Sequence, residues 1–168
     1  MILQRWSVWL EPSIKYNEDY KKMINYFNMA QSTQLFEPHL TLFGRIRDKP
    51  ELHFSFFEEL TNKQNPIALN ALKIEKGLAP WKSLYILFQS NSIIKEFQNL
   101  INHRLKQFRD YDFSPHLSLA YGNINVGQEE LNRIPVNKTI QFSSLSLIYT
   151  PDNINNWNLI KRFNFKII

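Results

Sequence analysis

The chain has 168 residues and no cysteine, and its 20 Lys and Arg against 15 Asp and Glu give a formal net charge of +5 at pH 7. The absence of cysteine excludes disulfides, thiolate nucleophiles and cysteine-ligated metal sites, and no apolar run approaches the roughly 20 residues needed to span a bilayer. The positive charge suits an anionic partner such as a phosphate, although the basic residues are scattered along the chain.

The length fits one domain, or one domain made of two similar lobes, and we expect residues 1–168 to form such a two-lobed domain. Met1 runs directly into the strand-like stretch Ile2–Leu10, which lacks the charged start and the small-residue cleavage site of a secretory signal. We therefore expect a cytoplasmic protein.

Apolar residues recur with a period of two in some segments, which predicts strands, and at spacings of three and four in others, which predicts helices. In chain order, the first half is expected to contain a strand over Gln4–Leu10, a helix over Asn17–Gln31, a strand over His39–Arg45, a helix that begins at Pro50, and a strand over Ile67–Glu75. The second half is expected to contain a strand over Leu84–Gln89, a helix over Asn91–Gln107, a strand over His116–Tyr121, a short helix over Glu129–Arg133, and strands over Thr139–Tyr149 and Trp157–Ile168.

Two pentapeptides repeat one pattern in the two halves of the chain. Pro38–Leu42 reads Pro-His-Leu-Thr-Leu and Pro115–Leu119 reads Pro-His-Leu-Ser-Leu, and together they use two of the four histidines. Each pentapeptide follows a strand and a helix, so Gln4–Arg45 and Leu84–Tyr121 repeat one unit. A histidine with a hydroxyl residue two positions later is weak evidence when it occurs once, whereas two copies in the same frame point to function.

Alternate residues of a strand point to the same face of the sheet. His39 and Thr41 therefore share one face, Leu40 and Leu42 share the other, and the second pentapeptide behaves in the same way. The leucines can anchor each strand in a core, but a buried polar pair without partners is costly. A cleft lined by both strands removes this cost and brings two imidazoles and two hydroxyls together.

This set of side chains meets the needs of cyclic phosphodiester hydrolysis. The reaction needs a base to activate water, an acid to protonate the leaving oxygen, and donors that hold the other phosphate oxygens. An unperturbed histidine pKa of about 6.5 lets one ring be neutral and the other protonated near neutral pH. Nothing in this chemistry demands a metal ion.

At these residues the chain resembles the 2H phosphoesterase superfamily, whose signature is two His-x-Ser/Thr strands that face each other across a cleft. The plant and yeast-type cyclic phosphodiesterase branch is the most similar. The matching segments are Ser7–Pro12, Phe36–Thr41, Gly77–Gln89, Ser114–Tyr121 and Leu145–Trp157. The resemblance implies an α+β, LigT-like fold of two lobes, in which two antiparallel β-sheets related by pseudo-two-fold symmetry face a central cleft and helices cover the outer faces.

The resemblance also implies hydrolysis of ADP-ribose 1″,2″-cyclic phosphate or of nucleoside 2′,3′-cyclic phosphates to 2′-phosphates, with no metal and no cofactor. It assigns acid–base catalysis to His39 and His116, and phosphate binding to Thr41 and Ser118. We expect His116 to activate water and His39 to protonate the leaving 3′ oxygen, although the near-symmetry of the motifs leaves the reverse open. The expected partner is a small cyclic nucleotide or an RNA end, with no membrane or protein partner, and the expected state is a monomer.

Four aromatic residues are candidates for a nucleotide pocket. Trp9 and Tyr121 match positions that line this pocket in the family, whereas Trp81 and Tyr85 stand where the family has phenylalanines. Trp9 lies on the strand face away from its apolar neighbours, which indicates an accessible ring. Tyr121 alternates with the core leucines of its strand, so a structural role is equally compatible, and core packing is the competing interpretation for Trp81 and Tyr85.

Some features of the chain differ from the family. His53 and His103 lie in predicted helices without a matching hydroxyl, and we interpret both as surface or structural residues. The absence of cysteine excludes redox control by a disulfide, and the longer insertions of the yeast form are missing, which leaves the substrate-recognising loops undefined.

Three other functions are compatible with parts of the pattern. A 2′-5′ RNA ligase-like protein or 2′,5′-oligonucleotide phosphodiesterase shares both motifs and needs a broader basic cleft, to which Arg45, Arg47 and Lys49 could contribute. A non-catalytic nucleotide-binding module would keep the cleft without turnover. A zinc hydrolase fits least well, because two histidines and two hydroxyls are a poor ligand set. Glu37, two residues before His39, is better placed to tune that histidine.

Overall fold

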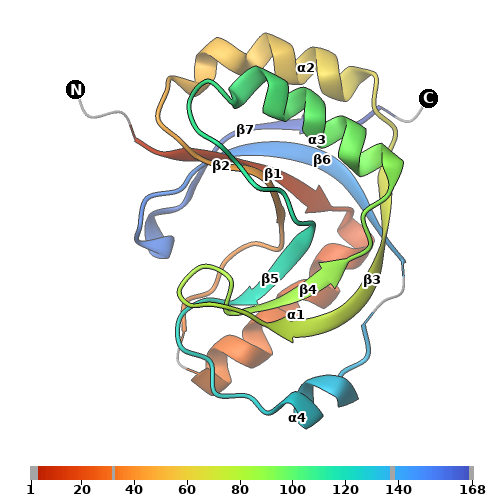
Figure 1. Cartoon of the computed structure of the whole chain (residues 1–168), viewed down its shortest axis with the longest axis vertical. Helices are drawn as coiled ribbons and strands as arrows, with labels where there is room; N and C mark the ends of the chain where they lie inside the picture. The colour runs from red at the N-terminus through yellow and green to blue at the C-terminus, as the bar shows by residue number, and fades with distance from the viewer. Residues whose placement is uncertain (1–3, 32, 137–138, 167–168) are drawn as a thin grey trace.

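The computed structural model describes residues 4–31, 33–136 and 139–166, and its elements follow the predicted order (Figure 1). The strands are β1 (Trp6–Pro12), β2 (Leu40–Ile46), β3 (Ile67–Lys76), β4 (Leu84–Phe88), β5 (His116–Ala120), β6 (Thr139–Tyr149) and β7 (Asn158–Asn164). The helices are α1 (Ile14–Gln31), α2 (Phe54–Asn62), α3 (Ser92–Leu105) and α4 (Gln128–Arg133), with short 3-10 helices η1 (Pro50–His53) and η2 (Ile154–Asn156).

The boundaries of several elements follow from local chemistry. The Asn91 side chain accepts a hydrogen bond from the backbone N–H of Ile94 at 2.9 Å, so Asn91 is the N-cap of α3 rather than its first residue. The helix predicted from Pro50 begins as η1 and continues as α2. The last strand was expected to reach Ile168, but β7 ends at Asn164. Residues 167–168 of that prediction, and residues 2–3 of the strand-like stretch Ile2–Leu10, lie outside the described residues.

The described strand pairs are all antiparallel and follow the order β1-β2-β5-β4-β3-β6-β7, with an additional pairing of β1 and β6. The beginning of β6 pairs with β3, and its remainder pairs with β1 and with β7. β2 and β5 meet through one residue pair, Leu40 with Leu117. The two expected sheets are therefore halves of one seven-stranded sheet, because β6 is long enough to serve both halves.

The helices cover the outside of this sheet, with α2 and α3 on one side and α1 and α4 on the opposite side (Figure 1). The two long helices cross between the repeated units. α1, from the first unit, packs against β5 of the second unit as well as against β1, and α3, from the second unit, packs against β2 of the first. Each unit therefore supplies the helix that supports the motif strand of the other.

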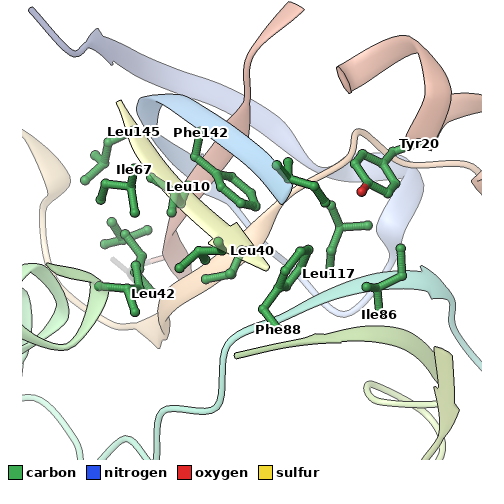
Figure 2. Packing of buried hydrophobic residues seen from close by; sticks show 14 of the residues in the cluster. Leu10, Tyr20, Leu40, Leu42, Ile67, Ile86, Phe88, Leu117, Phe142 and Leu145 are labelled. Atoms are coloured by element: carbon green, nitrogen blue, oxygen red, sulfur yellow. The ribbon is translucent and has the colours of Figure 1, made fainter. Parts of the chain in front are cut away.

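The core is built from the apolar residues that the periodicities mark. The pentapeptide leucines on β2 and β5 are fully buried, as alternation predicts, and so are the residues of the apolar stripe on α3. Figure 2 shows Leu40, Leu42 and Leu117 packed with Leu10 and Phe142 from β1 and β6. Burial of each such side chain contributes roughly 1.5–3 kcal/mol, so the leucines hold the two motif strands in place.

Candidate active site

The leucine pair between β2 and β5 places the two motifs side by side. In an antiparallel pair, residues directly opposite each other share a face of the sheet. Because Leu40 of β2 pairs with Leu117 of β5, the same antiparallel register sets His39 opposite Ser118 on one side of this pair. On the other side it sets Thr41 opposite His116. The leucines point into the core, so the histidines and the hydroxyl residues lie on the other face.

These four side chains line one cavity of about 270 Å³. The wall also contains Trp9, Trp81 and Tyr121, three of the four aromatic residues predicted for substrate binding. The structure thus brings seven of the eight predicted site residues together, from both halves of the sequence.

Both imidazoles are oriented by the same backbone contact. The Nδ1 atom of His39 lies 2.6 Å from the carbonyl oxygen of Glu37, and the Nδ1 atom of His116 lies 2.7 Å from the carbonyl oxygen of Ser114. A carbonyl oxygen only accepts, so Nδ1 carries the proton in each ring and Nε2 is the nitrogen left for chemistry. The proline between each carbonyl and its histidine favours extended backbone at the residue before it, which helps to hold the carbonyl in position.

His39 is almost completely buried. Its exposed fraction is 3%, the ring of Trp9 stacks on it with centroids 3.5 Å apart, and the Tyr121 hydroxyl lies 3.5 Å from its Nε2. Burial lowers the pKa of His39 to about 4, against the opposing hydrogen bond to Glu37 and with a smaller lowering by the charge of His116. At neutral pH this ring is therefore uncharged.

His116 is more open than His39 and is half-buried. The ring of Tyr85 lies edge-on to it, with centroids 5.2 Å apart, and the Lys82 ammonium lies 3.5 Å from the Ser114 hydroxyl. Burial lowers the pKa of His116, the hydrogen bond to the Ser114 carbonyl raises it, and the charge of Lys82 lowers it further.

The two motif hydroxyls and the Tyr121 phenol are among the donors of the cavity wall. Ser118 is buried and Thr41 is half-buried in the wall. Burial raises the pKa of Tyr121 well above its usual value, although a hydrogen bond with Ser118 opposes this effect. The phenol therefore stays protonated at neutral pH, where it can donate toward the Nε2 atom of neutral His39.

The expected accessibility of Trp9 needs correction, and the position of Tyr121 bears on the two roles left open for it. Trp9 is not accessible to solvent: its exposed fraction is 4%, because His39 covers one face and Trp157 packs against it edge-on with centroids 5.3 Å apart. Tyr121 does not follow the leucines of β5 into the core. The strand ends at Ala120, so alternation stops there and the ring lies in the cavity wall.

Tyr85 and Trp81 have different surroundings. Tyr85 is outside the cavity lining, and its hydroxyl donates to the Glu75 carboxylate at 3.0 Å. Trp81 is 38% exposed at the cavity and is not a core residue. The substrate-binding roles of both residues stay predictions.

The other two histidines lie away from the cavity. His53 is buried, 3.0 Å from the Asp48 carboxylate, and His103 is exposed on α3. Glu37 contacts His39 through its backbone carbonyl, while its carboxylate pairs with Lys21 at 3.1 Å. Its influence on the histidine is therefore exerted by the main chain.

Several residues of the cavity wall escape sequence-based prediction. Lys82, Arg109, Tyr111 and Trp157 all line the cavity. The first three lie in connecting segments where no periodicity marks them, and Trp157 is predicted only as the first residue of the last strand. The closeness of Arg109 and Tyr111 to the second pentapeptide in the sequence is the one signal that points to them.

One buried side-chain amide joins each motif strand to the helix that supports it. On α1, the Asn28 side chain donates to the Leu119 carbonyl of β5 at 3.1 Å. On α3, the Gln98 side chain donates to the Leu42 carbonyl of β2 at 3.3 Å. Each accepting leucine lies three residues after the histidine of its motif, so the two contacts are equivalent under the pseudo-symmetry.

Within the described ranges, no cluster of three or more His, Asp and Glu side chains is placed to hold a metal ion. None of the helices in the same part of the chain combines the length and the apolarity of a bilayer-spanning segment.

No protein-family model and no curated protein matches the sequence. Solved structures, however, share its fold. The apo form of E. coli LigT matches with a TM-score of 0.66 at 14% identity, over 99% of this chain and 100% of that chain. The protein TT0787 of Thermus thermophilus matches with a TM-score of 0.65 at 11% identity, over 96% of this chain and 97% of that chain. A structure described as a phosphoesterase matches with a TM-score of 0.64 at 11% identity, over 98% and 99%.

These likenesses establish the fold as the α+β, LigT-like fold that the motifs imply. E. coli LigT is also known in complexes with 3′-AMP, NADP+ and ATP. The comparisons do not separate the cyclic phosphodiesterase branch from its relatives. Four expectations stay predictions: membership of that branch, the single two-lobed domain, the monomeric state and the cytoplasmic location.

Proposed function

We propose that the chain is a two-histidine phosphoesterase that opens a cyclic phosphodiester, either ADP-ribose 1″,2″-cyclic phosphate or a nucleoside 2′,3′-cyclic phosphate. The observation that carries this proposal is the presence of two imidazoles, with the same backbone-fixed tautomer, in the wall of one cavity. The LigT-like fold supports it, because E. coli LigT forms a complex with the nucleotide 3′-AMP.

In the proposed reaction on a 2′,3′-cyclic phosphate, a neutral imidazole takes a proton from water while the water oxygen bonds to phosphorus. The bond between phosphorus and the 3′ oxygen breaks, and the second imidazole, which is protonated, gives its proton to that oxygen. The product is a 2′-phosphate, and proton exchange with solvent resets the two rings. Thr41 and Ser118 donate hydrogen bonds to the phosphate oxygens that do not react.

We assign the base to His39 and the acid to His116, which reverses the expectation from the resemblance. His39, with a pKa of about 4, is neutral at neutral pH, and the Tyr121 hydroxyl beside its Nε2 suits an acceptor. His116 is less enclosed, and a bound phosphate anion beside it raises its pKa toward the range in which it carries a proton. Two groups whose surroundings separate their pKa values are the pattern of an acid–base pair.

The nucleoside is proposed to lie against the aromatic part of the wall. The rings of Trp81 and Trp157 are 6.4 Å apart and 23° from parallel, and both line the cavity. Ring faces of this kind bind nucleobases by stacking, with little dependence on the base.

The test is hydrolysis of 2′,3′-cyclic nucleotides and of ADP-ribose 1″,2″-cyclic phosphate by the purified protein in the presence of EDTA. We expect turnover to fall by roughly 10²-fold or more in His39→Ala and in His116→Ala, and to be unchanged in His103→Ala, which alters an exposed histidine. If the wild-type protein turns over neither cyclic phosphate, the proposal is rejected. Binding of 2′-AMP without any turnover would instead indicate a non-catalytic nucleotide-binding module.

A second candidate function is cleavage or formation of 2′-5′-linked RNA. A neighbouring cavity of about 470 Å³ shares Trp9 and Trp157 with the first and is also lined by Phe36, Lys21 and Arg162. The aromatic rings suit a further base of an oligonucleotide, and the two cations of this wall pair with carboxylates of the same wall, Lys21 with Glu37 and Arg162 with Glu11. A competition between 2′,3′-cyclic AMP and a 2′-5′-linked oligoadenylate distinguishes the two functions, because the preferred substrate has the higher kcat/KM.

A further inference from the structure

The permanent charges on the cavity wall exceed what a simple cyclic nucleotide needs. Arg45, Lys82 and Arg109 line the cavity, and no Asp or Glu is among its described lining residues. A nucleoside 2′,3′-cyclic phosphate carries one negative charge. Lys82 lies beside the motif of His116 and can pair with that single charge. The guanidinium groups of Arg45 and Arg109 then have no anionic partner on such a substrate.

Arg45 is held in an unusual backbone conformation. Its φ is +63°, the one positive φ outside glycine among the described residues, and this left-handed conformation is unfavourable for a residue with a side chain. It lies in a bulge, because two steps along β1, from Trp6 to Val8, face three steps along β2, from Phe43 to Ile46. Bulges of this kind redirect side chains near functional sites.

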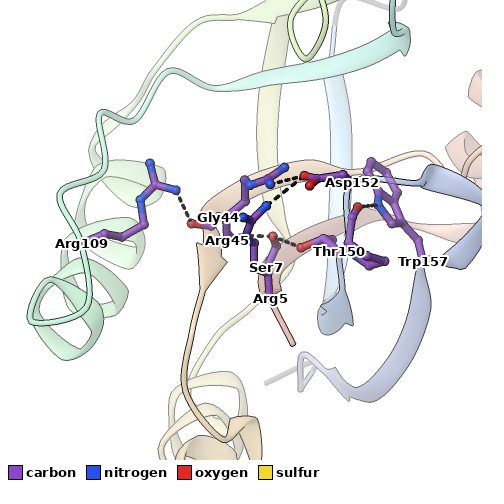
Figure 3. Close-up of polar contacts among 9 residues, drawn as sticks. Arg5, Ser7, Gly44, Arg45, Arg109, Thr150, Asp152 and Trp157 are labelled. Carbon is purple, nitrogen blue, oxygen red and sulfur yellow. Dashed lines mark hydrogen bonds and ion pairs between the residues drawn. The ribbon is translucent and has the colours of Figure 1, made fainter. Parts of the chain in front are cut away.

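Buried hydroxyl groups secure this conformation from behind. The Arg45 backbone N–H donates to the Ser7 hydroxyl at 3.0 Å, and the Ser7 hydroxyl lies 2.7 Å from that of Thr150 (Figure 3). Ser7 and Thr150 are both buried. The strained position is thus fixed by neighbouring strands rather than adopted by a free loop.

The guanidinium of Arg45 is only partly neutralised. It pairs with Asp152, but the same carboxylate oxygen also accepts from Arg5 at 2.9 Å, and the Asp152 side chain is 72% exposed (Figure 3). Two arginines therefore share one carboxylate. Arg109 donates to the carbonyl of Gly44, directly before Arg45, at 3.1 Å, and it forms no ion pair among the described residues.

A series of aromatic contacts runs from Arg45 to His39. The Arg45 guanidinium lies 5.3 Å from the centre of the Trp81 ring, the Trp81 and Tyr121 ring centroids are 5.9 Å apart, and the Tyr121 hydroxyl lies 3.5 Å from the Nε2 atom of His39. Arg45 also follows Thr41 by four residues on β2, roughly 13 Å along a strand, so we expect it to contact a different group from the phosphate that reacts at the histidines. The two cationic positions fit two separate phosphates on one ligand, with the nucleoside against the rings between them.

We propose that Arg45 and Arg109 form a second anion subsite, which selects cyclic phosphates whose nucleoside carries a further phosphate. This inference rests on the proposed function and names its substrate class. The further phosphate can be a 5′-phosphate, an internucleotide phosphodiester or a diphosphate, since a guanidinium recognises the same oxygens in each. A 5′-phosphate adds roughly 1.5 to 2 negative charges at pH 7, which matches the two guanidinium groups.

The kinetic test compares adenosine 2′,3′-cyclic phosphate with its 5′-phosphorylated form. We expect the wild-type kcat/KM to be at least about tenfold higher for the 5′-phosphorylated substrate, the size of one charge-assisted hydrogen bond. Arg45→Asn should abolish most of this preference, because asparagine tolerates the left-handed backbone but lacks the charge. Arg45→Lys should keep part of it. The kcat/KM values for a dinucleotide with a cyclic phosphate end and for ADP-ribose 1″,2″-cyclic phosphate are then compared with that of the 5′-phosphorylated substrate. The highest value identifies whether the second phosphate is a phosphodiester, a diphosphate or a 5′-phosphate.

Arg47→Asn is the matched control, because Arg47 is exposed and lies outside the cavity lining. Its preference should equal that of the wild type. The inference is overturned if the wild type does not prefer the 5′-phosphorylated substrate, or if Arg45→Asn lowers kcat/KM equally for both substrates.

A binding measurement separates this inference from the proposed function. Trp9, Trp81 and Trp157 line the cavity, so tryptophan fluorescence can report titrations with 2′-AMP and with adenosine 2′,5′-bisphosphate. If no cyclic phosphate is turned over, the proposed reaction is rejected. The subsite is still supported if the wild type binds the bisphosphate more tightly than 2′-AMP and if Arg45→Asn removes this difference in affinity. Equal affinity for the two ligands, or binding of neither, overturns it.

Discussion

At the scale of single residues, the two imidazoles make the same backbone contact but lie in different surroundings. His39 is buried under Trp9, whereas His116 is half-buried and lies near Lys82. The repeated pentapeptides make both histidines and their hydroxyl partners predictable from the sequence. The difference between the two rings is not, because it arises from residues of other segments that pack around each ring.

We expect a bell-shaped dependence of kcat/KM on pH with its maximum in mildly acidic solution. The proposed base His39 is active above its pKa of about 4, and the proposed acid His116 is active below its pKa, which burial and Lys82 hold below 6.5. Activity should therefore fall as pH rises above 6.5. Initial rates at constant ionic strength check this, and the residual activity of His116→Asn should lack the alkaline limb. A plateau that extends beyond pH 8 would contradict the assignment.

The buried state of His39 should also make stability depend on pH. Between pH 6.5 and about 4, the unfolded chain binds a proton at this residue and the folded chain does not. The free energy of unfolding is therefore lowered as pH falls through this window, by roughly 3 kcal/mol in full, and the contribution is complete above pH 6.5. Urea unfolding at several pH values should show a shallower pH dependence for His39→Gln than for the wild type.

The exposed His103 supplies the matched control for that measurement. His103→Gln should leave the pH dependence of unfolding unchanged, because it replaces an exposed side chain on α3 that lies outside the cavity. Parallel stability curves for His39→Gln and the wild type would mean that His39 binds its proton over the same pH range in the folded and the unfolded chain, and that its burial does not control its charge.

At the scale of elements, the two supporting helices act on the motif strands through buried amides. Asn28→Ala removes the hydrogen bond from α1 to the Leu119 carbonyl of β5. We expect a loss of about 1–3 kcal/mol in the free energy of unfolding and a fall in kcat, because β5 carries His116. Asn25→Ala, an exposed substitution on the same helix, should change stability by less than about 0.5 kcal/mol. Equal effects of the two variants in thermal unfolding would contradict a positioning role.

The type and order of the elements are predictable from the sequence because each has a clear period and end signals. The alternation of β2 is not kept along its whole length, however. Leu42 and Phe43 are adjacent and both fully buried, and Arg45 adopts a left-handed conformation. Both departures come from the register shifts between β1 and β2. A bulge depends on which strands pair and in what register, and no local pattern encodes this.

At the scale of the whole molecule, the repeat in the sequence predicts two similar halves but not how they interlock. α1 crosses to β5, α3 crosses to β2, and β6 pairs with strands of both halves. Neither half can bury its motif strand with its own helix alone. This exchange is a property of the tertiary arrangement, in which helices pack wherever an apolar face is open, and the chain order of the elements does not specify it.

The interlocked arrangement leads us to expect a single cooperative unfolding transition. Loss of α1 exposes β5 and loss of α3 exposes β2, so unfolding of one half removes apolar burial from the other, and partly folded states are destabilised. Circular dichroism at 222 nm, tryptophan fluorescence and calorimetry should give coincident transitions, with equal calorimetric and van't Hoff enthalpies. Two separated transitions would show that the halves fold independently, and that the motifs are brought together by docking of preformed lobes.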